Sequence, residues 1–168
     1  MIQQILVPVY LGDTSQEAVN HSLKLAQMFH GRVRFLFPLD PALRPCLNGS
    51  SAAGSEVEGS ADKLAQEFID HALELARQAG VEAEVQWVER EPSQAILEAC
   101  VSPRSGVAWG SRREKNLAAP RCDLVVMGER AFPHLSRKEL DALAANLSEQ
   151  QIPLLLIQPA SKRYSSAA

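Results

Sequence analysis

The chain has 168 residues, enough for one domain with a sizeable core. Charged residues make up 22% and hydrophobic residues 46%, which is ordinary for a globular protein. The net charge of −3 gives no field that favours nucleic acid or an anionic membrane. The longest apolar runs suit a buried strand and fall far short of the ~20 residues that span a bilayer. The first residues carry no basic segment typical of a signal peptide, so we expect a cytoplasmic protein.

The chain opens with a strand followed by a helix. Residues 2–10, IQQILVPVY, form an apolar run rich in β-branched side chains, which predicts a strand. Pro8 conflicts with this prediction, because proline cannot donate to a ladder. The T-S-Q-E sequence from Thr14 is a capping box that starts a helix, and apolar residues recur at helical spacing until Gly31 stops it.

A second strand and a second helix follow, separated by a long insert. Residues 32–39 predict the strand, and residues 61–79 predict the helix. The insert, 40–60, is rich in Pro, Gly, Ser and Ala, and we expect it to be flexible. Residues 81–88 then alternate apolar and polar side chains, which predicts a strand with one wet face at a sheet edge.

The last part of the chain predicts a helix, a second insert, a strand, a helix and a final strand. Proline in the first turn predicts a short helix over 92–100, and a basic segment without periodicity, 101–121, forms a second flexible insert. Residues 122–127, CDLVVM, predict a buried strand. A second capping box, S-R-K-E from Ser136, starts an amphipathic helix, and residues 152–157, IPLLLI, predict the last strand.

Alternating strands and helices define the fold class. Right-handed crossovers between such elements build a parallel sheet that is covered on both faces. We therefore expect an α/β fold with a single five-stranded parallel sheet, in the Rossmann-like order 3-2-1-4-5. It forms one domain over residues 1–160, followed by a polar tail, 161–168.

A ligand site is expected where the winding of such a sheet reverses, beyond the carboxyl ends of the first and fourth strands. No nucleophile with a paired base can be named, so we predict no catalytic residue. The four histidines lack metal-binding spacing with one another, so we predict no metal site. The residues of the candidate pocket leave those two strands or open the helix after the fourth: Tyr10, Gly12, Asp13, Met127, Gly128, Arg130, Ala131 and Asp141.

Five segments resemble, in order, the universal stress protein family. They are ILVPVYLGDTSQEAV, HGRVRFLFPL, EREPSQAILEA, CDLVVMGERAF and IPLLLIQP. The resemblance covers nearly the whole chain except 40–60 and 101–121. It implies a regulatory or binding protein of the stress response, and, in one branch of the family, a pocket for ATP or AMP.

The nucleotide-binding branch carries the pattern Gly-x2-Gly-x9-Gly-Ser/Thr, which only partly fits this chain. The four positions fall on Gly128, Ala131, Asp141 and Ala142. The acidic residue that ends the first strand in that branch falls on Tyr10. Ala131 resists positive φ, and Asp141 places a carboxylate where phosphate would lie, standing in for it in the first turn of a helix. We therefore expect a vestigial or divergent pocket without tight ATP binding; the alternative is a member that holds ATP or AMP through a divergent loop.

Several of these residues have two readings. Asp13 caps the first helix or binds ribose or a metal ion. Tyr10 fills the vacated pocket or stacks on a ring. Arg130 forms a surface pair with Glu129 or binds an anion. Trp109, in the basic insert, packs against the body or contacts a protein partner.

The cysteines indicate the redox state of the compartment. Cys46, Cys100 and Cys122 are far apart in the sequence and odd in number, which indicates reduced thiols without a redox role.

The strand Ile152–Ile157 shows no alternation of apolar and polar residues, and an unprotected apolar edge strand needs a cover. Pairing with a second copy about a two-fold axis would cover it, and the resemblance implies the same homodimer.

Overall fold

A computed structural model describes residues 2–10, 13–39, 58–101, 122–132 and 135–158. Its centre is a five-stranded parallel sheet in the order β3-β2-β1-β4-β5, which confirms the predicted class and strand order. The strands are β1 (Gln4–Pro8), β2 (Arg32–Pro38), β3 (Ala83–Val88), β4 (Leu124–Gly128) and β5 (Leu154–Ile157).

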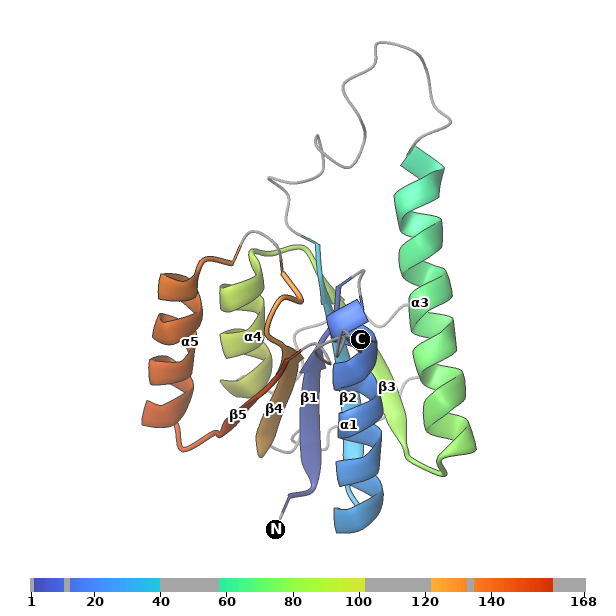
Figure 1. The fold of residues 1–168 in the computed structure, drawn as a ribbon, viewed down its shortest axis with the longest axis horizontal. Helices are drawn as coiled ribbons and strands as arrows, with labels where there is room; N and C mark the ends of the chain where they lie inside the picture. The colour runs from blue at the N-terminus through green and yellow to red at the C-terminus, as the bar shows by residue number, and fades with distance from the viewer. Residues whose placement is uncertain (1, 11–12, 40–57, 102–121, 133–134, 159–168) are drawn as a thin grey trace, which may run out of the picture.

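Helices cover both faces of the sheet (Figure 1). One face carries α1 (Asp13–Phe29) and α3 (Glu58–Gln78), and the other carries α4 (Pro92–Val101) and α5 (Arg137–Glu149). Figure 1 shows α4 and α5 side by side near β5, and α3 at the opposite side beside β3. None of these helices is long and apolar enough to cross a membrane, a finding that holds for the described residues.

Two apolar cores result, one on each face. Side chains alternate across a strand, so Ile5 and Val7 point to α1 and α3, and Leu6 points to α4 and α5. The central strands β1 and β4 are buried along their whole length. This is the burial that a parallel sheet covered on both faces requires.

Pro8 lies at the end of the central strand without breaking a ladder. The Val9 N–H donates to the Leu36 carbonyl on β2 at 2.9 Å, so the Pro8 nitrogen faces the β4 side. Pairing between β1 and β4 is limited to the pairs Ile5↔Leu124 and Leu6↔Val125. The missing N–H therefore falls beyond the last pair, which resolves the conflict in the sequence.

Helix termini follow the sequence signals at α5 but not at α1. The capping box at Ser136 is present. By contrast, α1 begins at Asp13, so Thr14 lies inside its first turn, and the predicted cap at Thr14 is wrong. The same helix ends through His30, which adopts a φ of 53°, rather than through positive φ at Gly31. Gly31 instead lies in close contact with the chain before β1, since a Cβ there would lie 3.1 Å from the carbonyl oxygen of Gln3.

The edge position of β3 is confirmed, but its wet face is not. All six residues of β3 are partly buried, those at the polar positions included. Arg34 of β2, which is 4% exposed, donates from Nε to Oε1 of Glu84 at 2.6 Å. The carboxylate on the supposed wet face therefore neutralises a buried guanidinium on the neighbouring strand.

The two inserts fall mostly outside the described residues. Their ends are helical, since α3 already begins at Glu58 and α4 runs to Val101. The remaining residues of both inserts, Trp109 and the polar tail 161–168 lie outside the described part of the chain.

Candidate ligand site at the carboxyl ends of β1 and β4

The two strands at the switch point are neighbours, so their carboxyl ends open onto one place. Tyr10 follows β1, and residues 129–132 and 135–136 lie between β4 and α5. Gly12 lies outside the described residues. Asp13 is the first residue of α1, and its side chain is also outside the described part.

Gly128 is required for packing against α1. A Cβ at this position would lie 2.6 Å from the carbonyl oxygen of Thr14 and 2.7 Å from its Cβ. The first turn of α1 therefore touches the end of β4 directly. Gly128 does not adopt positive φ, so close approach is the reason for glycine here.

Tyr10 contacts aromatic rings from β2 and from the segment that follows β4. Its ring stacks on Phe37 with centroids 6.1 Å apart, and lies 5.8 Å from the ring of Phe132 in the loop after β4. Its backbone N–H donates to Oγ of Ser15 at 3.0 Å. Tyr10 is thus a half-buried aromatic in a packed cluster, a role that fits the first of its two readings. The sequence analysis missed Phe132, which no pattern marks.

The chain makes a tight turn directly after β4. The Ala131 N–H donates to the Gly128 carbonyl at 3.1 Å, and Ala131 is buried without positive φ. Met127 is buried in the core under α4 and α5, so its side chain serves packing. Arg130 is exposed.

The N-cap residue of α5 already has a carboxylate as its hydrogen-bond partner. Ser136 Oγ accepts from the Glu139 N–H at 3.3 Å, and Glu139 Oε2 accepts from the Ser136 N–H at 2.7 Å. The Ser136 hydroxyl and then its backbone N–H hold the pKa of the Glu139 carboxyl below its usual range. A helix N-terminus is where an anionic ligand would bind, and here a side chain of the same charge supplies the negative group.

Asp141 does not occupy that place. Because α5 begins at Arg137, Asp141 lies beyond the first turn, and the first-turn position predicted for it is wrong. Its carboxylate is exposed and lies 3.4 Å from Nε of Arg137, whose Nη1 is 3.3 Å from Oε1 of Glu129. Glu129 therefore pairs with Arg137 across the loop. The acidic residue in the first turn of α5 is instead Glu139, which the S-R-K-E motif could have indicated.

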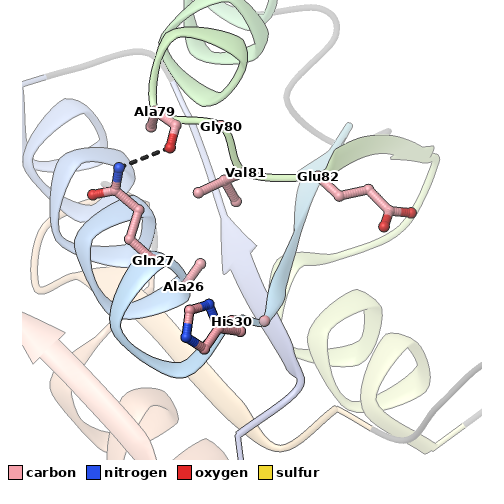
Figure 2. A pocket seen from close by; sticks show the side chains of 8 residues that line it. Ala26, Gln27, His30, Ala79, Gly80, Val81 and Glu82 are labelled. Atoms are coloured by element: carbon pink, nitrogen blue, oxygen red, sulfur yellow. Dashed lines mark hydrogen bonds between the residues drawn. The ribbon is translucent and has the colours of Figure 1, made fainter.

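A separate cavity of about 410 Å³ lies at the opposite end of the sheet (Figure 2). It is formed where the last turns of α1 and α3 approach each other. Gln27 Nε2 donates to the Ala79 carbonyl at 2.7 Å across one side of it, and His30 and Glu82 flank the other. The described residues contain no group of three or more metal-ligating side chains, in this cavity or elsewhere.

Comparison with known proteins defines the class. The model of the universal stress protein family matches residues 1–103, from β1 through α4, and the chain belongs to this family. The match ends before β4 and its loop, so it does not include the positions of the nucleotide pattern. A search of curated protein sequences gave no match.

Solved structures share the fold at low sequence identity. A universal stress family protein from Burkholderia pseudomallei is 18% identical, with a TM-score of 0.57 over 93% of this chain and 96% of that one. UspA from Lactobacillus plantarum is 17% identical, with a TM-score of 0.58 over 93% and 97%. An Arabidopsis thaliana family protein with AMP bound is 13% identical, with a TM-score of 0.60 over 98% and 97%.

Proposed function

We propose that this protein is a homodimeric regulatory or binding member of the universal stress family that neither holds ATP tightly nor catalyses a reaction. The observation that carries the proposal is the self-contained start of α5. There the Glu139 carboxylate accepts from Ser136, at the place where the phosphates of a nucleotide would need free N–H groups.

Two further features support weak nucleotide binding. The Tyr10 ring packs between Phe37 and Phe132 and occupies space at the switch point. The negative charge of Glu139 would repel a phosphate near the helix start. A nucleotide would have to displace both the ring and the carboxylate, and each displacement costs binding free energy.

Isothermal titration with ATP and magnesium at neutral pH tests this proposal. We expect no binding tighter than about 100 μM, a free energy of about −5.5 kcal/mol. Glu139→Gln is a matched variant, because the amide keeps the length of the cap and removes its charge. Micromolar affinity in the unaltered protein would contradict the proposal, and tighter binding by the variant alone would support it.

The alternative is a member that binds ATP or AMP through a divergent loop. Two observations favour it: the structural relatives include universal stress proteins with AMP and with cAMP, and Gly128 keeps its place at the carboxyl end of β4. Adenine nucleotide carried through gentle purification, detected in the denatured protein by its absorbance and mass, would favour this alternative.

Homodimerisation through β5 is the second part of the proposal. This strand is paired only with β4, at the edge of the described sheet, and Leu155 is 40% exposed. A second copy would satisfy the edge amides and cover the leucine. Sedimentation at micromolar concentration should give a dimer for the unaltered protein and a monomer for Leu155→Lys. Leu64→Lys, which alters an exposed leucine of α3, is the control that should remain dimeric.

A cytoplasmic location completes the proposal. Cys100 and Cys122 are free thiols in the structure, which suits a reducing compartment. Fractionation of cells that express the tagged protein should recover it with the cytosolic fraction.

A further inference from the structure

Two cysteines that are far apart in the sequence meet under the last turn of α4. Cys100 belongs to that turn, and Cys122 lies two residues before β4. Both are buried in the core under α4 and α5, at 2% and 4% exposed. The Cys100 thiol donates a hydrogen bond to Cys122, whose own Sγ donates to the Leu124 carbonyl at 3.2 Å. The chain thus brings together two thiols that no spacing motif connects.

The two thiols differ in acidity. The hydrogen bond from Cys100 is the main influence that lowers the pKa of Cys122, and backbone N–H groups of Leu124 and Leu6 act in the same direction. The same bond, followed by burial, raises the pKa of Cys100. Cys122 is therefore the thiol that ionises first and reacts first, because the thiolate is the nucleophile.

The surroundings of the pair are more polar than a core usually is. Arg34, buried in the sheet beneath α4, favours the ionised form of Cys100. Gln4 lies on the same face of the sheet, because it is two residues before Leu6 on β1. It is 1% exposed. A guanidinium close to the second thiol helps that thiol to lose its proton once the first has been oxidised.

We propose that Cys100 and Cys122 form a peroxide-responsive dithiol, which oxidises to a disulfide that ties the end of α4 to the start of β4 across segment 101–121. The two thiols are hydrogen-bonded within one buried cluster, so the bond closes inside the packed domain. This inference is independent of nucleotide binding and of dimerisation.

The reaction needs one hydroperoxide per disulfide. The Cys122 thiolate attacks one oxygen of hydrogen peroxide and becomes a sulfenic acid, and the leaving hydroxide takes a proton to form water. The sulfur of Cys100 then attacks the sulfur of that sulfenic acid, loses its proton and releases a second water. Two thiols are oxidised by two electrons in total, and the peroxide is reduced to two waters.

The burial of the two thiols limits which oxidants can reach them. Thiols that are almost fully covered react slowly with bulky reagents, whereas hydrogen peroxide is close to water in size. We therefore expect the folded protein to resist an aromatic disulfide reagent under conditions where peroxide converts the pair.

The test uses the full chain with Cys46→Ala, which leaves only the pair. After peroxide treatment, intact mass should fall by two hydrogen atoms, and digestion should yield one linked peptide that contains both cysteines. Dithiothreitol should restore the original mass and both free thiols. Because the parent chain keeps both buried cysteines, this measurement does not depend on a variant that could misfold.

Single replacements in the same background identify the order of events. With Cys100→Ala, peroxide should leave a sulfenic acid on Cys122 that a dimedone probe captures, whereas Cys122→Ala should give at least tenfold less captured product. Oxygen addition to the parent chain without a disulfide would overturn the proposal. So would free thiols that persist in the folded protein at a peroxide dose that oxidises the urea-unfolded chain.

Discussion

The two faces of the sheet bury polar groups in different ways. Under α1 and α3 the buried hydroxyls belong to a helix: Ser22 Oγ donates to the Val19 carbonyl at 2.8 Å, and Ser15 accepts from the backbone of Tyr10. Under α4 and α5 the buried polar side chains come from strands: Arg34 reaches Glu84, and neither polar atom of the Gln4 amide has a hydrogen-bond partner among the described residues.

The difference follows from geometry. A helical hydroxyl can return a hydrogen bond to its own backbone a turn away, so its burial costs little. A strand side chain stands away from its own backbone and must find its partner on another element. On the α1 face a buried hydroxyl is therefore satisfied within its own helix, whereas on the α4 face a buried polar side chain needs a partner on another strand, as Arg34 has in Glu84.

Removing an aromatic ring from the α1 face should have the largest effect. Phe37 is buried and lies 4.7 Å from Trp87 and 6.1 Å from Tyr10 between ring centroids. Phe37→Ala should lower the free energy of unfolding by about 4 kcal/mol, because it removes this packing and leaves a cavity. Urea unfolding at fixed protein concentration measures the change. Phe29→Ala, at a position that is 39% exposed, should cost under about 1 kcal/mol; equal losses would contradict the packing argument.

Gly128→Ala should come next, because it tests the contact between α1 and β4. The added methyl group would overlap the Thr14 backbone, which cannot rotate away. We expect a loss of about 3 kcal/mol, at the upper end for overpacking. Gly80→Ala is the control: it has open space but a φ of 66°, and should cost about 1 kcal/mol from backbone strain alone. A Gly128 variant as stable as the Gly80 variant would show that α1 shifts freely.

The buried ion pair on the α4 face should respond to loss of its acid. Glu84→Ala leaves the Arg34 guanidinium without that carboxylate, and we expect a loss of about 2 kcal/mol, below that of a fully buried pair because Glu84 is 39% exposed. Glu82→Ala breaks the neighbouring exposed pair with Arg32 and should change stability by under about 0.5 kcal/mol. Thermal unfolding of both variants separates them; identical melting temperatures would place Arg34 in contact with water.

Replacing Gln4 should have the smallest effect, and in the opposite direction. Its buried amide has no hydrogen-bond partner in the described part of the chain, so Gln4→Leu removes a desolvated polar group and should stabilise the protein by about 1 kcal/mol. Gln3→Leu makes the same substitution at the exposed neighbouring position and should give no such gain. Destabilisation by Gln4→Leu in urea titration would mean that the amide has a bonding role on the α4 face.

Much of the site could be located from the sequence, but its chemistry could not. The order of strands and helices placed the switch point after β1 and β4, where Tyr10 and Gly128 do lie. The assignment of Asp141 failed because counting along a nucleotide-binding pattern assumed a helix start that the capping box at Ser136 sets several residues earlier. At α5, although not at α1, the capping box predicts the helix start better than the nucleotide-binding pattern does.

The sequence by itself determined the elements, their order and the α/β class, because apolar periodicity and capping motifs act between residues that are close along the chain. Only the tertiary structure decided that Arg34 pairs with Glu84, that Gly128 must be glycine because of Thr14, and that Cys100 meets Cys122. These contacts join residues far apart in the sequence, and they exist because the sheet order brings neighbouring strands and their covering helices together. No local sequence pattern predicts such a contact, because each of the two residues by itself fits an ordinary position in a strand or a helix.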